Sequence, residues 1–204
     1  MVDKDAVRRG YDDIADIYAA DRIEDGRDFE ILTEFLTSLT EAERTLDVGC
    51  GQGTPVLRKL SSIATAIGYD FSRKQLELAG ENVPVAPLVQ GDMTTLPICD
   101  DAFDAIVAYY SLIHVPIEDH QSVIDEFARV LRPNGRVLLN EGRGEWCGMN
   151  LDWLDSGVGM QWNNAGAEAT RNQLEKAGFT IINEWYVEIP DDGHWVFFSA
   201  QLDV

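Results

Sequence analysis

Apolar residues recur along this chain with two periods, one typical of helices and one typical of strands. Near the N-terminus, Val7, Tyr11, Ile14 and Tyr18 follow one another at helical spacing, and a second helix is predicted through residues 29–39. Further along, short apolar runs alternate with helical stripes, and glycine, proline and asparagine mark the turns between them. Strands that alternate with helices in this way indicate a mostly parallel sheet in an α/β fold.

The individual elements follow from the apolar runs and the turns. Strands are predicted at residues 45–48, 64–69, 85–89, 103–108 and 136–140, and helices at about 56–60, 72–80, 118–131 and 167–177. Ser72 is expected to cap its helix, with Gln75 as its capping-box partner. Residues 179–189 and 195–200 flank the turn Asp191-Asp192-Gly193, which predicts an antiparallel hairpin at the edge of the sheet.

The length of 204 residues suits one well-packed domain, so we expect a single domain over residues 1–204, with N-terminal helices in 1–43. There is no apolar signal core and no long apolar run, which favours a cytoplasmic protein without a membrane partner. The cysteines, Cys50, Cys99 and Cys147, form no C-x-x-C pair, so no metal site is expected. A monomer or a homodimer is equally compatible with the sequence.

Charge narrows the range of partners. The chain has 36 acidic and 16 basic residues and a formal net charge of -20, which repels nucleic acid and anionic membrane surfaces. The carboxylates are spread along the chain, as in proteins of halophiles, where dense surface carboxylates are screened by molar salt. An acidic surface that attracts a cationic substrate is the alternative explanation.

A glycine-rich turn follows the first predicted strand and leads into a helix. Only glycine lets the main chain approach a ligand without a Cβ in the way, and Gly49, Gly51 and Gly53 supply this freedom. Asp70 ends the second predicted strand, where a carboxylate can accept hydrogen bonds from ribose hydroxyls. Together they predict a nucleoside-containing cofactor. Thr54 stands where a dinucleotide motif has its last glycine, which disfavours a nicotinamide dehydrogenase.

The sequence resembles the class I S-adenosylmethionine-dependent methyltransferases, in particular short single-domain enzymes that act on small molecules. This resemblance implies a Rossmann-like α/β fold, with a seven-stranded, mostly parallel sheet, helices on both faces and a C-terminal antiparallel hairpin. The matching segments are Leu46-Asp47-Val48-Gly49-Cys50-Gly51-Gln52-Gly53, Gly68-Tyr69-Asp70-Phe71-Ser72, Gly91-Asp92-Met93 with Leu96-Pro97, Phe103-Asp104, and Leu131-Arg132-Pro133-Asn134-Gly135-Arg136.

The resemblance also implies that the cofactor is S-adenosyl-L-methionine and assigns residues to its methionine and ribose portions. Gly49 and Gly51 would pass beneath the methionine portion. Asp47 and Gly53 belong to the same motif and are counted with them. Asp70 would bind the ribose.

Other residues are implied at the adenine and at the sulfonium. Phe71 would flank the adenine, while Asp92 and the backbone of Met93 would bind its edge. Tyr109 would lie beside the sulfonium. Tyr18 would cover the cofactor from the N-terminal helix, or would only pack that helix.

Methyl transfer from a sulfonium is an in-line displacement, so a general base is needed only if the acceptor must lose a proton. The candidate catalytic residues are His114, after the fourth predicted strand, and Glu141, after the fifth. His114 could instead pack a helix or shape the pocket. Glu141 could equally be a strand-end carboxylate that faces solvent.

Residues 142–166 are the predicted substrate lid, and they hold Trp146, Trp153 and Trp162 among glycines. Tryptophan faces bind cations or stack on flat rings, so one interpretation is that the acceptor is aromatic or carries an ammonium group. The other interpretation is that these side chains only bury the lid against the sheet. Trp146, Trp153 and His194, in the final hairpin, are the candidate substrate-binding residues.

The expected function is methyl transfer from S-adenosylmethionine to a small-molecule acceptor. A non-catalytic regulatory protein that keeps the fold and binds the same cofactor is the alternative. It would bind the cofactor tightly and show no turnover on any acceptor.

The net charge predicts that the protein is destabilised at low ionic strength, because its carboxylates repel one another. The melting temperature should rise when KCl is increased from millimolar to molar concentration. Sucrose at matched osmolarity is the control, since it strengthens burial without screening charge. A melting temperature that does not respond to KCl would rule out the halophile interpretation.

Overall fold

A seven-stranded sheet forms the centre of the computed structural model, which describes residues 2–21, 25–189 and 193–203. The strand order is β3-β2-β1-β4-β5-β9-β8. The first five strands are parallel, and the last two form an antiparallel hairpin that joins the sheet at β5. Their bounds are β1 Arg44–Val48, β2 Thr65–Asp70, β3 Leu88–Gln90, β4 Phe103–Ala108, β5 Leu131–Gly142, β8 Phe179–Ile189 and β9 Gly193–Leu202. The predicted sheet is confirmed, although Asp191 and Asp192 of the predicted turn lie outside the described residues.

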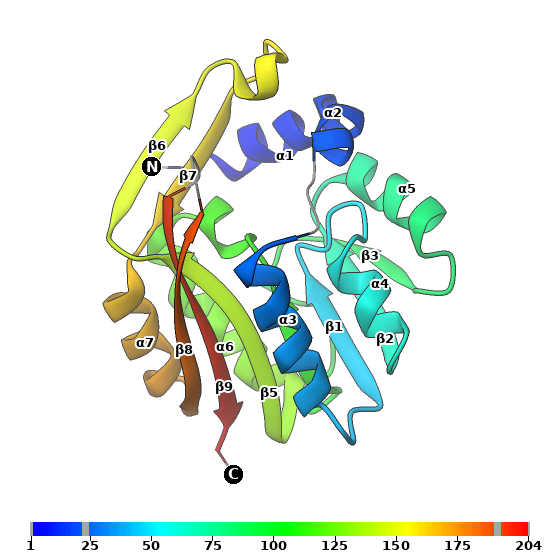
Figure 1. Cartoon of the computed structure of the whole chain (residues 1–204), viewed down its shortest axis with the longest axis vertical. Coiled ribbons are helices and arrows are strands. Elements are labelled where there is room, and N and C mark those ends of the chain that lie inside the picture. Colours follow the sequence, from blue (N-terminus) through cyan, green and yellow to red (C-terminus); the bar gives the residue numbers. More distant parts are fainter. Residues whose placement is uncertain (1, 22–24, 190–192, 204) are drawn as a thin grey trace.

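Helices cover both faces of the sheet (Figure 1). In β4, Ala105 and Val107 face one apolar core, whereas Ile106 and Ala108 face the other. This two-sided burial explains why β4 is apolar at almost every position. The helices are α3 (Arg27–Ser38), α4 (Val56–Ser61) and α5 (Arg73–Asn82) on one face, and α6 (His120–Val130) and α7 (Ala167–Lys176) on the other.

Two further units lie at the carboxyl ends of the parallel strands (Figure 1). One consists of α1 (Lys4–Asp13) and α2 (Ala15–Asp21), which replace the single helix predicted there because buried Ile14 leaves helical geometry. The other is the hairpin of β6 (Trp146–Asn150) and β7 (Met160–Asn164), with the short helix η3 (Trp153–Asp155) between its strands. Among the helices of the described ranges, none has the length and apolar character needed to cross a bilayer.

The third strand is shorter than predicted and lies further along the chain. It was expected at 85–89, but β3 begins at Leu88. Pro87 has no N–H to donate, and only its carbonyl pairs with β2, accepting from the N–H of Gly68 at 3.0 Å. Val85 is 77% exposed. Prolines are tolerated here because β3 is the edge strand of the sheet.

Candidate functional site

A cavity opens at the carboxyl ends of β1, β2 and β4, where parallel α/β sheets bind their ligands. About 830 Å³ of space lies within it when its open, solvent-filled mouth is included. Nine of the ten residues predicted to bind a cofactor line it, namely Tyr18, Asp47, Gly49, Gly51, Asp70, Phe71, Asp92, Met93 and Tyr109.

Gly53 is the tenth, and it does not line the cavity. Its φ is +86°, and a Cβ at this position would lie 3.1 Å from Cγ2 of Val83 and 3.3 Å from Cβ of Ala79. The turn and the close packing against α5 account for this glycine, and its predicted contact with the cofactor stays a prediction.

Gly49 is required because Ser111 packs directly against it. Its φ is +79°, and a Cβ would lie 2.2 Å from Cβ of Ser111. The hydroxyl of Ser111 donates to the carbonyl of Val48 at 2.8 Å, which fixes the segment after β4 against the glycine turn. Any larger residue at Gly49 would push the two segments apart.

Asp70 is a buried carboxylate that joins two segments of backbone. Oδ2 accepts from the N–H of Gly51 and Oδ1 accepts from the N–H of Ser72, both at 2.8 Å. Burial raises the pKa of Asp70 to about 6, and these two hydrogen bonds limit the rise. At neutral pH the carboxylate is thus largely ionised and held in one orientation beside the cavity.

Gln75 lines the cavity, although the sequence predicted only that it would be the capping-box partner of Ser72. The predicted N-cap is confirmed, because Oγ of Ser72 accepts from the N–H of Gln75 at 3.2 Å. The reciprocal half of the capping box is missing, since the N–H of Ser72 goes to Asp70 instead. The side-chain amide of Gln75 is therefore buried with no hydrogen-bond partner in the described structure, and it lines the cavity. The sequence did hold one indication of this position: Gln75 is a polar residue in the first turn of the helix that follows Asp70.

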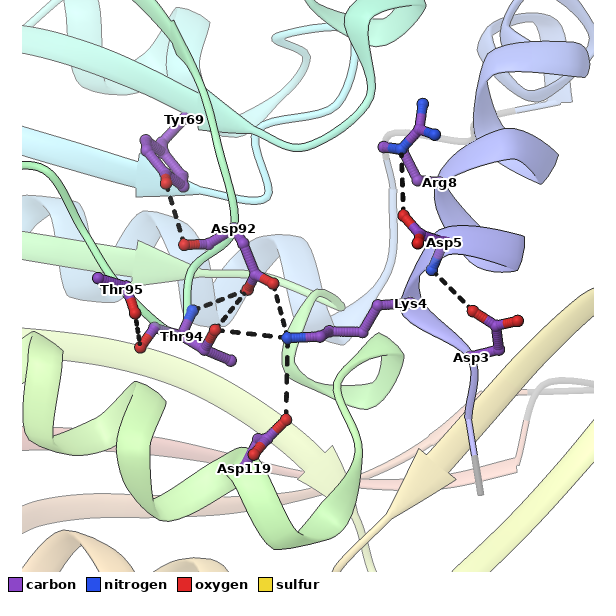
Figure 2. A network of polar contacts seen from close by, with 9 residues as sticks. All are labelled: Asp3, Lys4, Asp5, Arg8, Tyr69, Asp92, Thr94, Thr95 and Asp119. Carbon is purple, nitrogen blue, oxygen red and sulfur yellow. Dashed lines mark hydrogen bonds and ion pairs between the residues drawn. The ribbon is translucent and has the colours of Figure 1, made fainter.

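Asp92 lies at another end of the cavity and has an unforeseen partner, Lys4 (Figure 2). Nζ of Lys4 donates to Oδ2 of Asp92 at 2.6 Å, while Oδ1 accepts from the backbone and the hydroxyl of Thr94. Partial burial acts to raise the pKa of Asp92, but these hydrogen bonds hold it below its ordinary value. Asp92 is therefore ionised and oriented.

His114 is a buried residue that lines the cavity next to Tyr11. Its Nδ1 lies 3.1 Å from the carbonyl of Gln161, to which only a protonated nitrogen can donate. The neutral ring then accepts the hydroxyl proton of Tyr11 at Nε2, at 2.8 Å. Burial lowers the pKa of His114 to about 4, so the ring is neutral at physiological pH.

The segment that supplies most of this cavity is similar to a known protein family. The sequence profile of a methyltransferase domain matches residues 46–139, from β1 to β5. Residues 46–139 are thus similar to methyltransferase domains. The matched stretch supplies most of the cavity lining, including the glycine turn, Asp70 and Asp92.

Individual relatives agree with this assignment. Methyltransferase GfsG of Streptomyces halstedii is 41% identical over 110 residues, which cover 50% of this chain and 38% of that protein. The chain thus spans well under half the length of this relative.

Solved structures share the fold of this chain. A 1,6-didemethyltoxoflavin-N1-methyltransferase of Burkholderia thailandensis superposes with a TM-score of 0.76 at 17% identity, covering 98% of this chain and 88% of that one. The [4+2]-cyclase SpnF superposes with a TM-score of 0.74 at 21% identity, covering 97% of this chain and 95% of that one. At these identities the likeness establishes the Rossmann-like fold and no more.

Glu141 does not line the cavity, contrary to the expectation for a candidate base. It is fully buried in β5, and Oε1 accepts from the N–H of Gly142 at 2.8 Å. Oε2 lies 3.5 Å from Nδ1 of His120, which is also fully buried and donates from Nε2 to Val115. Burial raises the pKa of Glu141 to about 7, opposed by backbone hydrogen bonds. The side chain thus forms an internal pair with His120.

The three candidate substrate residues lie in different surroundings. Trp146 is 53% exposed on β6, and His194 is 60% exposed beside Glu188. Neither lines the cavity, so the structure does not bring them to the site. Trp153 packs against Tyr11 and Tyr18, with ring centroids 5.6 and 5.4 Å apart, and so contacts two lining residues.

Because burial raises the pKa of Glu141, the free energy of unfolding is predicted to depend on pH. The pKa is about 7 in the folded protein and ordinarily 4.5, so the folded state keeps a proton that the unfolded chain releases between these values. The free energy of unfolding should therefore fall as the pH rises through this window. In Glu141→Gln, stability relative to the wild type should increase by about 1–3 kcal/mol from pH 4.5 to 7.

Urea unfolding at several pH values measures this difference. Glu175→Gln, an exposed position on α7, is the matched control and should keep the wild-type pH dependence. Parallel curves for wild type and Glu141→Gln would contradict the assignment.

Proposed function

We propose that this chain binds S-adenosylmethionine in the cavity and transfers its methyl group to a small-molecule acceptor. The observation that supports this most directly is the lining of one cavity by the glycine turn after β1, Asp70 at the end of β2 and Asp92 after β3. These groups stand at successive strand ends, as an extended nucleoside ligand with an amino-acid tail requires.

The side chains present fit the nucleoside portion. The Asp70 carboxylate can accept hydrogen bonds from hydroxyl groups, and the buried amide of Gln75 offers both a donor and an acceptor. A ribose, which carries two adjacent hydroxyls, would pair with both residues. This would satisfy the amide, which is costly to bury without a partner. Asp92 would accept from the adenine amino group, with Phe71 beside the ring.

The remaining residues orient the reactants and exclude water. The bound cofactor would supply a methyl carbon attached to a cationic leaving group, so the protein has only to position the acceptor in line with it. Gly49 and Gly51 would let the backbone approach the methionine portion. Tyr11 and Tyr18, from α1 and α2, cover the cavity and limit access of water.

We assign His114 to the orientation of Tyr11 and not to proton removal. Both ring nitrogens have partners, and the low pKa makes the buried imidazole a weak base. Tyr11 would then present its oxygen to the cavity as a hydrogen-bond acceptor for an acceptor hydroxyl or amine. Trp153, packed against Tyr11, would belong to the cover over the acceptor, together with residues 142–166.

Relatives support a small-molecule acceptor. The solved N1-methyltransferase holds S-adenosylhomocysteine together with its own acceptor, 1,6-didemethyltoxoflavin. The cyclase among the structural neighbours shows that this fold also serves another reaction, so turnover has to be measured.

Methyl transfer predicts a labelled product. Purified protein incubated with methyl-labelled S-adenosylmethionine and a metabolite extract should transfer the label to a small molecule and form S-adenosylhomocysteine. Heat-treated protein is the control. Tight cofactor binding without labelled product from diverse extracts would instead favour the non-catalytic alternative.

Asp70→Ala should weaken the binding of S-adenosylhomocysteine by about 1–3 kcal/mol, because the ribose hydroxyls and two backbone donors lose their acceptor. Titration calorimetry measures the change. Asp125→Ala, at an exposed position of α6, is the matched control. Equal affinities for the two variants would refute the ribose assignment.

A further inference from the structure

Lys4 is placed unusually for a cation in this chain. The chain has a formal net charge of -20, and Lys4 lies in the first turn of α1, where it lines the cavity. Its side chain is 30% exposed, so its charge is partly removed from water. This position was not singled out by any motif in the sequence.

The ammonium group of Lys4 lies between two carboxylates from different parts of the fold (Figure 2). Nζ is 2.6 Å from Oδ2 of Asp92, in the connection after β3, and 3.8 Å from Oδ2 of Asp119, in the turn before α6. It is also 3.4 Å from Oγ1 of Thr94. Without the ammonium group, the negative charges of these two carboxylates would repel each other with no cation between them.

The rest of α1 is held by contacts of a different kind. Asp12, in its last turn, accepts from the hydroxyl of Ser72 and the N–H of Lys74, at 2.7 and 3.1 Å. In the middle, Gly10 lets the helix approach β7 so closely that a Cβ would lie 3.0 Å from Cε of Met160. At the N-terminal end of α1, the N–H of Asp3 donates to Oε1 of Gln161 in β7 at 3.0 Å, and Lys4 links this end of the helix to Asp92 beside the cavity.

The hydrogen bonds of Asp92 leave room for a ligand. Oδ1 accepts two hydrogen bonds from Thr94, which use both of its lone pairs. Oδ2 accepts one from Lys4, so one lone pair remains for another donor. An amino group at the edge of a bound base could therefore pair with Oδ2 while Lys4 stays in place.

We propose that Lys4 and the adenine amino group share Oδ2 of Asp92, an inference that rests on the proposed function. Lys4 is then a positioning residue that holds α1 closed over the bound nucleoside. Closure and nucleoside binding then stabilise each other, because each orders the same carboxylate. Release of the nucleoside requires the ion pairs of Lys4 to open, so salt accelerates it.

The test measures the dissociation rate of S-adenosylhomocysteine by stopped-flow tryptophan fluorescence, at KCl concentrations from 0.3 to about 2 M. In Lys4→Met, dissociation should be about three- to tenfold faster than in the wild type at the lowest salt, and should depend less on salt. Lys4→Arg keeps the charge and should restore most of the wild-type rate. Lys176→Met, at an exposed position of α7, makes the same change in net charge and should behave as the wild type.

A second measurement follows the helix itself. Amide hydrogen exchange of residues 4–13 should be faster in Lys4→Met than in Lys176→Met, and bound S-adenosylhomocysteine should slow it in the wild type. If the wild type binds S-adenosylhomocysteine and the two methionine variants release it at equal rates, the role of Lys4 is overturned and the proposed function stands. If the wild type does not bind S-adenosylhomocysteine at all, both are overturned.

Discussion

The carboxylate of Asp70 joins the two backbone segments from which the cavity is built. The N–H of Gly51, after β1, and the N–H of Ser72, before α5, both donate to it in the interior of the protein. Burying this carboxylate costs free energy, as its raised pKa shows, and the two hydrogen bonds offset part of that cost. The glycine turn and the start of α5 are thereby held in one relative position. Because α5 begins there, it also carries Gln75 to the cavity wall.

The carboxyl ends of the parallel strands supply the floor of the cavity, and elements outside the sheet supply its cover. Helix α1 contacts Asp92, in the segment after β3, through Lys4, and it contacts the start of α5 through Asp12. It also packs against β7 at Gly10. Tyr11 then links the helix to His114 and to Trp153 of the hairpin segment. Helix α1 and the segment between β6 and β7 are thus in contact. Under the proposed function, this contact would couple cofactor binding to ordering of the acceptor site.

Asp70 and Glu141 illustrate how a perturbed carboxyl group can serve structure or ligand binding. Both stand at the carboxyl ends of strands, and burial raises the pKa of both. Asp70 lines the cavity, whereas Glu141 is enclosed with His120 inside the protein. The strand end alone therefore does not identify a catalytic base, and the face on which the side chain emerges decides its role.

The sequence by itself determined the sheet, its antiparallel hairpin and most of the cavity lining. Apolar runs reveal buried strands because the hydrophobic effect acts at each position locally, and glycines with Asp70 and Asp92 follow strands that must end at one edge. Only the tertiary structure decided the surroundings of Gln75, Gly53, Lys4, Glu141 and Trp146. Each depends on a partner or a neighbouring surface distant in the chain: Asp70 takes the N–H that Gln75 would have bound, α5 packs on Gly53, and Asp92 lies 88 residues from Lys4. Such partners are determined by how helices and strands pack against one another. The periodicity of apolar residues along a single element does not predict this packing.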